Sequence, residues 1–514
     1  MPAKVLMVQG TSSSVGKSLL AAALCRSFAR KGVRVAPFKA QNMSNNAAVC
    51  ADGAEIGRAQ AVQAAAAGIE PTADMNPILL KPEANSRSQV IVLGRPWQTL
   101  QAGSYYRRKE QLWPVVTAAL DKLRSAYELV IIEGAGSPAE LNLRSFDIVN
   151  MAIARHAHAP VLLVGDIDRG GIFAQLLGTL WLLAPEERAL VRGLVVNKFR
   201  GDPALFTDGV RILEERGGVP VLGVVPYLPA LTIPEEDAVA LDSTAPRTPT
   251  TIDIVVIRLP HIANFDDFDP LRTEAGVGLR YVQTAAALGR PNAIILPGTK
   301  STIADLAWLR TEGIADAIRT LAAQGTAVVG ICGGYQMLGR VIRDTAHVES
   351  QNGAAPGLGL LPVETLFEAA KATFQVRARV LGGPGWLGTA AGEEVEGYEI
   401  HMGRTSGGRP WLESVRLNGD PVEGTDGAAS DDGRIWGCYL HGLFANPALR
   451  RCWLASLRQS EPCHSEMSPA SVSGAALLDA ALDRLADAVE AALDMRKLAA
   501  IVARNDQNKG IVNE

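Results

Sequence analysis

A cysteine flanked by glycines has the setting of a nucleophile. Cys332 follows the apolar run 327–331 and precedes Gly333 and Gly334. Such a strand-to-helix turn strains the backbone and places the thiol at a helix N-terminus, which favours the thiolate, and nearby N–H groups can bind an oxyanion. The alternative is an inert buried thiol. We predict that Cys332 is a nucleophile, with the N–H of Gly333 in its oxyanion hole.

The nucleophile requires a base, and two histidines are associated with apolar runs further along the chain. His441 follows the run 435–440, and His401 stands at the end of the run 395–400. Either imidazole could accept the proton of a thiol, although the pattern around His401 also suits a structural contact or a contact with glutamine. We favour His441. Near His261 stand three aspartates, where a metal site is one interpretation and an interdomain or substrate loop the favoured one.

A glycine-rich loop near the N-terminus predicts a nucleotide site. The apolar run 5–8 is followed by Gly-Thr-Ser-Ser-Ser-Val-Gly-Lys-Ser at 10–18 and then by an Ala/Leu-rich helical stretch. Backbone N–H groups of such a loop bind phosphate oxygens, a lysine neutralises the β- and γ-phosphates, and a serine ligates Mg²⁺. Similar turns without a nucleotide are the alternative. The residues predicted to bind ATP are Gly10, Thr11, Ser14, Gly16, Lys17 and Ser18.

Polar residues at the ends of later runs would complete this site, because ligands of open α/β sheets bind at the carboxyl ends of the strands. Glu133 follows the run 129–132 and could hold Mg²⁺ together with Ser18, or could be a capping carboxylate. Lys39 could meet the transferred phosphoryl group, and the amide of Asn197 could bind adenine. Further carboxylates, which could contact a metal or belong to ordinary loops, are Asp52, Glu55, Asp166 and Asp168.

Short apolar runs alternate with helical stretches along the chain, which is typical of parallel sheets covered on both faces. A Thr- and Pro-rich stretch at 241–251 divides the runs into two sets. We predict an α/β protein with a nucleotide-binding domain at 1–240, a second α/β domain at 251–450 and a helical tail at 465–514. The runs are 5–8, 33–38, 129–132, 161–164, 194–196 and 221–225, and then 252–257, 293–296, 327–331, 395–400 and 435–439.

The composition indicates an enzyme with small-molecule partners. The 514 residues carry a net charge of −4, and Lys and Arg are dispersed. No basic stripe indicates nucleic acid, and no polybasic helix indicates a membrane surface. The first apolar run is too short for a signal peptide or a spanning helix, so we expect a cytoplasmic protein. The six cysteines include no CxxC pair, which argues against a zinc site or a disulfide framework.

The glycine-rich loop resembles that of dethiobiotin synthetase and its relatives, a P-loop branch that phosphorylates carboxylates. Five residues separate Gly10 from Gly16, where the usual motif has four. The resemblance implies that Glu133 contacts the metal, because that branch also carries an acid there.

The second domain resembles class I glutamine amidotransferases in the order and spacing of Cys332 and His441. Those enzymes form a glutamyl thioester and release ammonia. Gly298 matches the loop that supplies an oxyanion-hole N–H in that family. The usual family continues His-x-Glu, whereas this chain has Leu443, as in the cobyrinate/cobyrate amidating subgroup. The histidine therefore needs another acceptor or works in a dyad.

Further stretches, at 9–13, 37–46, 76–82 and 398–403, resemble the cobyric acid synthase family. The resemblance implies that ATP and glutamine are used to amidate the b, d, e and g carboxylates of adenosylcobyrinic acid a,c-diamide through acyl phosphates. Cobalt would belong to the substrate.

The same resemblance implies corrinoid contacts within 41–63 and 81–89. Cobyrinic acid a,c-diamide synthase, which shares both domains, is the alternative enzyme. A regulator of the partitioning-ATPase type is disfavoured because Cys332 and His441 are both present, and because Ser12 stands where those proteins carry an extra lysine.

Overall fold

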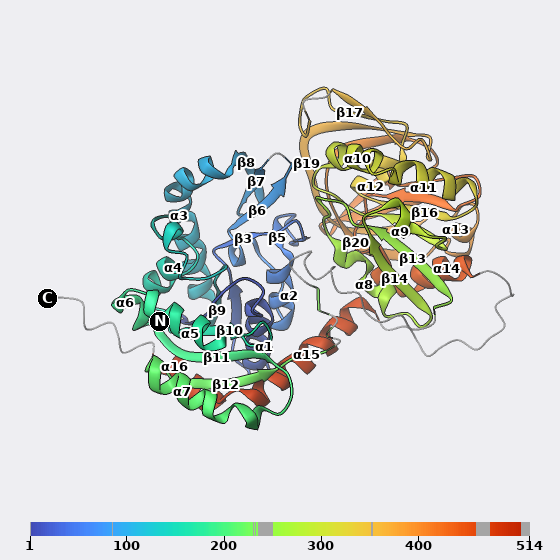
Figure 1. Ribbon diagram of the computed structural model, residues 1–514. Helices are drawn as coiled ribbons and strands as arrows, with labels where there is room; N and C mark the ends of the chain where they lie inside the picture. Colours follow the sequence, from blue (N-terminus) through green and yellow to red (C-terminus); the bar gives the residue numbers. More distant parts are fainter. Residues whose placement is uncertain are drawn as a thin grey trace.

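The chain forms two lobes, each built on its own parallel sheet (Figure 1). The predicted α/β class is therefore confirmed. Within the described residues no helix is long and apolar enough to cross a membrane. Most of the predicted linker 241–251 lies outside the described residues, as does Cys463. The computed structural model describes residues 2–84, 86–229, 231, 233–234, 250–350, 353–458 and 473–504.

The first lobe has a six-stranded parallel sheet in the order β12-β11-β10-β1-β9-β2. All six runs predicted for this domain lie in it. Side chains alternate between two buried faces, so that Val5 and Met7 belong to one core and Leu6 and Val8 to the other. Its strands are β1 (Lys4–Gly10), β2 (Val35–Phe38), β9 (Leu129–Glu133), β10 (Val161–Asp166), β11 (Val191–Phe199) and β12 (Val221–Pro226).

Helices cover both faces of this sheet. One face packs against α3 (Ala102–Ala126), α4 (Met151–His156), α5 (Ile172–Leu182) and α7 (Thr207–Gly217). The other packs against α1 (Lys17–Arg30), α15 (Gly474–Ala492) and α16 (Met495–Ala503). The helix α2 (Arg58–Ala66) lies beside α1, and α6 spans Pro185–Arg188.

The last two helices return from the end of the chain to the first lobe, where α15, drawn in red, lies beside α1 (Figure 1). Arg26 of α1 pairs with Asp479 and Asp483 of α15, each at 2.7 Å. Leu482 and Leu485 are buried in the same core as the first strand. The apolar stripe of α15 thus covers one face of the first lobe's sheet, although the whole second lobe lies between them in the sequence.

The first lobe also contains a smaller group of strands, which faces the second lobe. It consists of a four-stranded sheet, β3-β6-β7-β8, and the hairpin β4-β5. These strands and the start of α2 carry the polar stretches singled out in the sequence at 41–63 and 81–89. Their bounds are β3 (Gln41–Met43), β4 (Ala47–Val49), β5 (Glu55–Gly57), β6 (Ile78–Glu83), β7 (Arg87–Val92) and β8 (Arg95–Gln101).

The second lobe has a sheet in the order β14-β13-β15-β16-β24-β23, in which only β23 is antiparallel. The strands are β13 (Ile252–Ile257), β14 (Val277–Val282), β15 (Ala293–Leu296), β16 (Ala327–Ile331), β23 (Ala428–Ala429) and β24 (Ile435–Cys438). The helices are α8 (Asp269–Arg272), α9 (Ala285–Leu288), α10 (Thr302–Thr311), α11 (Ile314–Ala323), α12 (Gly333–Leu338), α13 (Trp386–Thr389) and α14 (Pro447–Leu457).

One predicted strand belongs elsewhere. The run 395–400 is part of β20 (Glu394–Gly407), which pairs antiparallel with β19 (Val363–Val380) in a separate sheet. Val395 is buried in the core of the second lobe, whereas Ile400, five residues later and therefore on the other face of the strand, is buried against the first lobe. The remaining strands of the sheet are β17 (Val341–Arg343), β18 (Ala354–Pro356), β21 (Leu412–Leu417) and β22 (Asp420–Asp426).

The lobes meet through both apolar and charged contacts. Val49, Leu79 and Ile91 of the first lobe pack with Ile400 of the second in a small core of their own. Glu55, which is 1% exposed, pairs with Lys81 of its own lobe and with Lys371 of the second. Glu55 thus joins a cation of each lobe at the boundary between them.

Candidate active site

The phosphate loop joins β1 to α1 and is held by tight packing. A Cβ on Gly10 would lie 2.5 Å from Cγ2 of Val15, and one on Gly16, whose φ is +98°, would lie 2.2 Å from the amide of Asn197. Glycine is therefore required at both positions. The Nζ of Lys17 donates to the carbonyl of Ser12 at 2.9 Å and to that of Gly136 at 3.1 Å. These carbonyl contacts hold the ammonium group across the loop.

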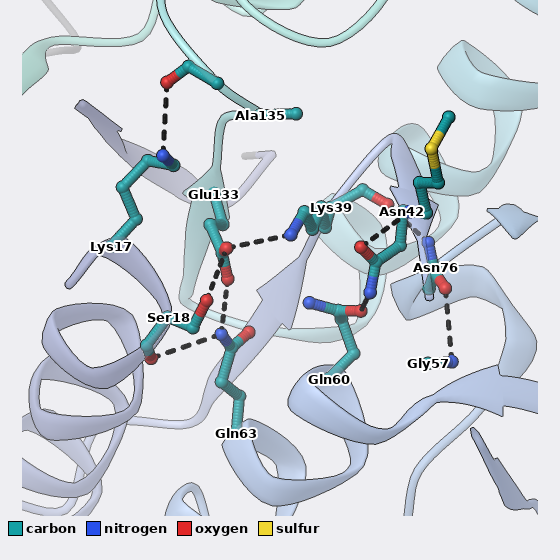
Figure 2. A network of polar contacts seen from close by, with 12 residues as sticks. Lys17, Ser18, Lys39, Asn42, Gly57, Gln60, Gln63, Asn76, Glu133 and Ala135 are labelled. Carbon is teal, nitrogen blue, oxygen red and sulfur yellow. Dashed lines mark hydrogen bonds and ion pairs between the residues drawn. The ribbon is translucent and has the colours of Figure 1, made fainter. Parts of the chain in front are cut away.

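Glu133 is the centre of a buried network behind the loop (Figure 2). Its carboxylate accepts hydrogen bonds from Ser18 Oγ at 2.8 Å, Lys39 Nζ at 2.9 Å and Gln63 Nε2 at 2.6 Å. Burial opposes its charge, but Lys39 and the hydrogen bonds outweigh burial and lower the pKa of Glu133. The carboxylate is therefore ionised at neutral pH, next to the serine hydroxyl of the loop.

The residues of this network fit a nucleotide with Mg²⁺. Magnesium is usually held by one or two carboxylates together with substrate phosphates and water, and Ser18 and Glu133 provide a hydroxyl and a carboxylate in contact. Lys17 and Lys39 provide two cations at the same edge of the sheet. Within the described parts of the chain no three His, Cys, Asp or Glu residues gather into a metal cluster. The ion would thus depend on the nucleotide as well as on the protein.

Several other strand-end residues make contacts within the protein. Asn197 donates its amide to the carbonyl of Val15 at 2.7 Å, so it braces the phosphate loop. Asp166 accepts from Lys198 at 2.9 Å, and Asp168 pairs with Arg200 at 2.6 Å.

Asp52 and Glu55, which could contact a metal or belong to ordinary loops, are also bonded within the protein. Asp52 accepts from the N–H of Ala54 in a turn, at 3.0 Å. Both carboxylate oxygens of Glu55 are paired with lysines at the boundary between the lobes. Gln63, which lies in the stretch where the resemblance implies corrinoid contacts, donates to Glu133. The sequence alone does not show which amide side chains in such a stretch point into the protein.

The candidate nucleophile lies in a strained turn between β16 and α12. Cys332 has φ +53° and ψ −111°, values that a side chain rarely adopts. The two following glycines allow α12 to approach the neighbouring strand: a Cβ on Gly334 would lie 1.9 Å from the carbonyl oxygen of Leu296. The Sγ of Cys332 lies 3.6 Å from the carbonyl oxygen of Ile400. The sequence Gly-Ile-Cys-Gly-Gly is thus explained by local packing.

A buried aspartate supplies the acceptor that the sequence left open. Nδ1 of His441 lies 2.6 Å from Oδ2 of Asp267, and Oδ1 of Asp267 accepts from the N–H of Gly442 at 2.9 Å. Asp267 lies in η5 (Phe265–Phe268), after β13, whereas His441 follows β24. The carboxyl ends of both strands meet at one edge of the sheet. The interpretation as a dyad without a third residue was therefore wrong, because the acid comes from a distant segment.

The aspartate and the thiol together determine the charge of the imidazole. Burial alone would lower the pKa of His441, but Asp267 and Cys332 outweigh burial and raise it to about 10. With Asp267 on Nδ1, the Nε2 position is left to face the thiol. The arrangement keeps the imidazole protonated at neutral pH, next to the thiol of Cys332.

Cys332 and His441 line one cavity of about 160 Å³, together with residues of both lobes. Gly298 and Gly333 border it, and in the described chain neither of their N–H groups donates to a protein acceptor. These two groups are therefore available to an oxyanion. The first lobe contributes Lys81, Glu83, Gln89 and Thr99 to the lining.

The competing histidines have partners of their own. His401 lines the same cavity, but its Nδ1 lies 3.0 Å from the carbonyl of Gly403, and its ring stacks on Tyr439 with a centroid separation of 3.7 Å. His261 is paired with Asp305, with 2.7 Å between Nδ1 and Oδ1. The metal interpretation at His261 has no support, because its aspartate neighbours 266 and 267 point to other partners.

Family models match the two lobes separately. Residues 6–239 match the CobQ/CobB/MinD/ParA nucleotide binding domain, and residues 253–449 match the CobB/CobQ-like glutamine amidotransferase domain. Fold and site together define a P-loop nucleotide-binding domain joined to a glutamine amidotransferase domain.

Curated relatives are similar over nearly the whole chain. A cobyric acid synthase of Chloroflexus aggregans is 60% identical and covers 89% of this chain and 92% of its own. One of Chloroflexus aurantiacus is 57% identical, covering 96% and 98%, and one of Herpetosiphon aurantiacus is 53% identical, covering 98% and 99%. The chain belongs to the cobyric acid synthase family. Among solved structures, PurLQS from Thermotoga maritima is 21% identical with a TM-score of 0.31, over 40% of this chain and 99% of that one, which is too weak to inform the fold.

Proposed function

We propose that this chain amidates the b, d, e and g carboxylates of adenosylcobyrinic acid a,c-diamide in cobalamin biosynthesis, using ATP and ammonia from glutamine. The names of its relatives support the product. The observation that carries the chemistry is the combination of two sites in one chain: a phosphate loop with an ionised carboxylate, and a Cys-His-Asp arrangement whose cavity is lined by both lobes.

Glutamine would be hydrolysed in the second lobe. The thiolate of Cys332 attacks the carboxamide carbon, and the N–H groups of Gly298 and Gly333 bind the oxyanion. The C–N bond breaks as the His441 imidazolium gives its proton to the leaving ammonia. Water then attacks the thioester while the imidazole accepts a proton from it, which releases glutamate and restores the thiolate and the imidazolium. Asp267 holds the imidazole in orientation throughout.

The carboxylate would be activated in the first lobe. Its oxygen attacks the γ-phosphorus of ATP, ADP leaves, and ammonia then displaces phosphate from the acyl phosphate to give the amide. Lys17 and Lys39 are placed to stabilise negative charge on the phosphoryl oxygens. Mg²⁺ held by Ser18 and Glu133 would neutralise the charge of the phosphates. The lining of the cavity by Lys81 and Gln89 supports release of ammonia toward this lobe.

The test is a complete reaction with the full-length protein, the a,c-diamide, ATP, Mg²⁺ and glutamine. Masses of the corrinoid are followed in time, together with ADP and glutamate. We expect four successive conversions of a carboxylate to an amide, each with one ADP and one glutamate. If cobyrinic acid is amidated only at its a and c positions, and the a,c-diamide is not consumed, the alternative enzyme is correct.

A further inference from the structure

An arginine of the first lobe reaches the surroundings of the glutaminase histidine in the second. Arg58 is the first residue of α2. Its Nε lies 3.0 Å from Oδ2 of Asp266, and the side chains of the pair are 15% and 9% exposed. Its Nη2 donates to the hydroxyl of Tyr398, and its guanidinium lies 4.9 Å from the centre of that ring. Arg58 therefore contacts two residues of the other lobe.

Each of these two residues is next to a member of the Cys-His-Asp arrangement. The ring of Tyr398 stacks on the imidazole of His441, with 5.1 Å between centroids and 14° between planes. The backbones of these two residues also exchange hydrogen bonds, at 2.9 and 3.2 Å. Asp266 directly precedes Asp267 in η5. A displacement of Arg58 would therefore be felt at both the imidazole and its acid.

A second contact from the first lobe reaches the same loop independently. The N–H of Ala47 donates to Oδ1 of Asn264 at 2.9 Å. The amide nitrogen of Asn264 lies 3.4 Å from Nε2 of His441, and the residue has φ +51°. The first lobe thus contacts this loop at two positions, Asn264 and Asp266.

The charges explain why Arg58 matters to this loop. Asp266 and Asp267 are adjacent and both largely buried, so their negative charges repel one another. Burial raises the pKa of Asp266, Arg58 opposes that effect, and Asp267 adds to it. Without Arg58, a buried carboxylate would lose its cationic partner, which is costly enough to drive protonation or a shift of the loop. Protonation would change the charge next to Asp267, and a shift of the loop would move Asp267 itself.

We propose that Arg58 is a positioning residue of the glutaminase site, supplied by the nucleotide-binding lobe, and that the second lobe does not hold Asp267 and His441 in working order without it. The inference rests on the proposed hydrolysis of glutamine at Cys332. Through Arg58 the nucleotide-binding lobe would contribute to glutamine hydrolysis, although Arg58 itself would not contact glutamine.

The test compares full-length Arg58→Gln, Arg58→Lys and Tyr398→Phe with wild type. Arg34→Gln is the matched control, because Arg34 lies in the same lobe in an exposed pair with Glu128. Release of glutamate gives kcat and KM for glutamine, and ammonium chloride as the nitrogen source reports the synthetase site alone.

We expect Arg58→Gln to lower kcat for glutamine by about 100-fold, the cost of a small misplacement of catalytic groups, with KM changed by less than about two-fold. Amidation from ammonium chloride should stay at the wild-type rate. Arg58→Lys should recover part of kcat, because an ammonium can pair with Asp266 but cannot also bridge to Tyr398. Tyr398→Phe, which removes only the hydroxyl, should lose less than Arg58→Gln, and Arg34→Gln should match wild type.

Two results with Arg58→Gln would overturn the inference. One is an unchanged kcat for glutamine. The other is an equal loss of amidation activity with glutamine and with ammonium chloride, which would mean a general structural defect. Failure of the proposed function would look different. In that case wild type itself would release no glutamate, or Cys332→Ala would release as much as wild type.

Discussion

At the scale of single residues, the chemistry depends on three side chains that face one another from separate turns. Cys332 has a strained backbone in a turn whose following glycines allow close packing. His441 is charged because Asp267 and Cys332 outweigh the cost of burial. The role of each side chain can be tested by measuring amidation with glutamine and with ammonium chloride separately.

Replacing Cys332 by alanine should abolish amidation from glutamine but leave amidation from ammonium chloride intact, because the activating site is in the other lobe. Rescue should strengthen as pH rises, since free ammonia is then a larger fraction of the total. Amide formation is measured with each nitrogen source across pH. Cys452→Ala, which removes a partly buried thiol outside the cavity, is the control. Glutamine-dependent turnover in Cys332→Ala would contradict the assignment.

Replacing Asp267 by asparagine should lower kcat for glutamine by about 10²–10⁴-fold, the usual contribution of acid–base catalysis. The pH profile should also move. Asp267 and Cys332 together raise the pKa of His441 to about 10, so removal of Asp267 lowers that pKa, and the imidazolium is lost at a lower pH. We expect the alkaline limb of glutamate release to shift to lower pH. An unshifted limb would mean that another group governs it; Asp431→Asn, at an exposed position, is the control.

At the scale of elements, the first lobe places its cations and carboxylate by bringing strand ends and helix starts together. β1 leads into the phosphate loop and α1, while the neighbouring strands β9 and β2 deliver Glu133 and Lys39 to the same edge. The helix α2 links the two sites, because Gln63 near its end holds Glu133 and Arg58 at its start holds Asp266. This one helix thus contacts the surroundings of both sites.

Replacing Lys17 by alanine should reduce amidation by about 100-fold or more with either nitrogen source, because charge on the phosphoryl group is no longer neutralised. Hydrolysis of glutamine should remain. The readout is ADP and amide formation, compared with glutamate release. Lys31→Ala, at the exposed end of the same helix, should behave as wild type. Full amidation by Lys17→Ala would refute the nucleotide site.

At the scale of the whole molecule, buried charges hold the lobes against one another. Burial alone would raise the pKa of Glu55, but Lys371 and Lys81 outweigh it and lower the pKa to about 2. A carboxylate whose pKa is lowered by folding stabilises the fold at any pH above its pKa in the unfolded chain, which is near 4.5. That stability is lost as the pH falls from there toward 2.

Replacing Lys371 by methionine should therefore reduce the stability of the assembled lobes by about 1–3 kcal/mol at neutral pH, because a buried carboxylate loses one of its partners. The difference from wild type should shrink as the pH falls toward 2. Urea unfolding followed by circular dichroism at several pH values measures it. Arg377→Met is the control, since Arg377 lies on the same strand in an exposed pair with Glu396. Equal losses in both variants would argue against a special role for the buried pair.

The sequence by itself determined what depends on local pattern. The six apolar runs of the first lobe all became strands of one sheet, because a strand buried on both faces is apolar without interruption. The phosphate loop and the cysteine turn were recognisable because their glycines are required within a few residues of the functional side chain. The family resemblance was confirmed by relatives that are similar over most of the chain and by the two family models.

Only the tertiary structure decided which distant residues complete the sites. Asp267 reaches His441 because the ends of β13 and β24 share one edge of a sheet, a closeness that no spacing in the chain records. Asn197 and Gln63 could not be told from ligand contacts, because an amide serves equally well inside and outside a site. Arg58 and Asp266 are ordinary charged residues in the sequence, and they meet only because the lobes pack together. Local patterns can be recognised in the sequence because the residues involved are close together in the chain. Contacts between distant segments form only when the chain packs into its tertiary structure.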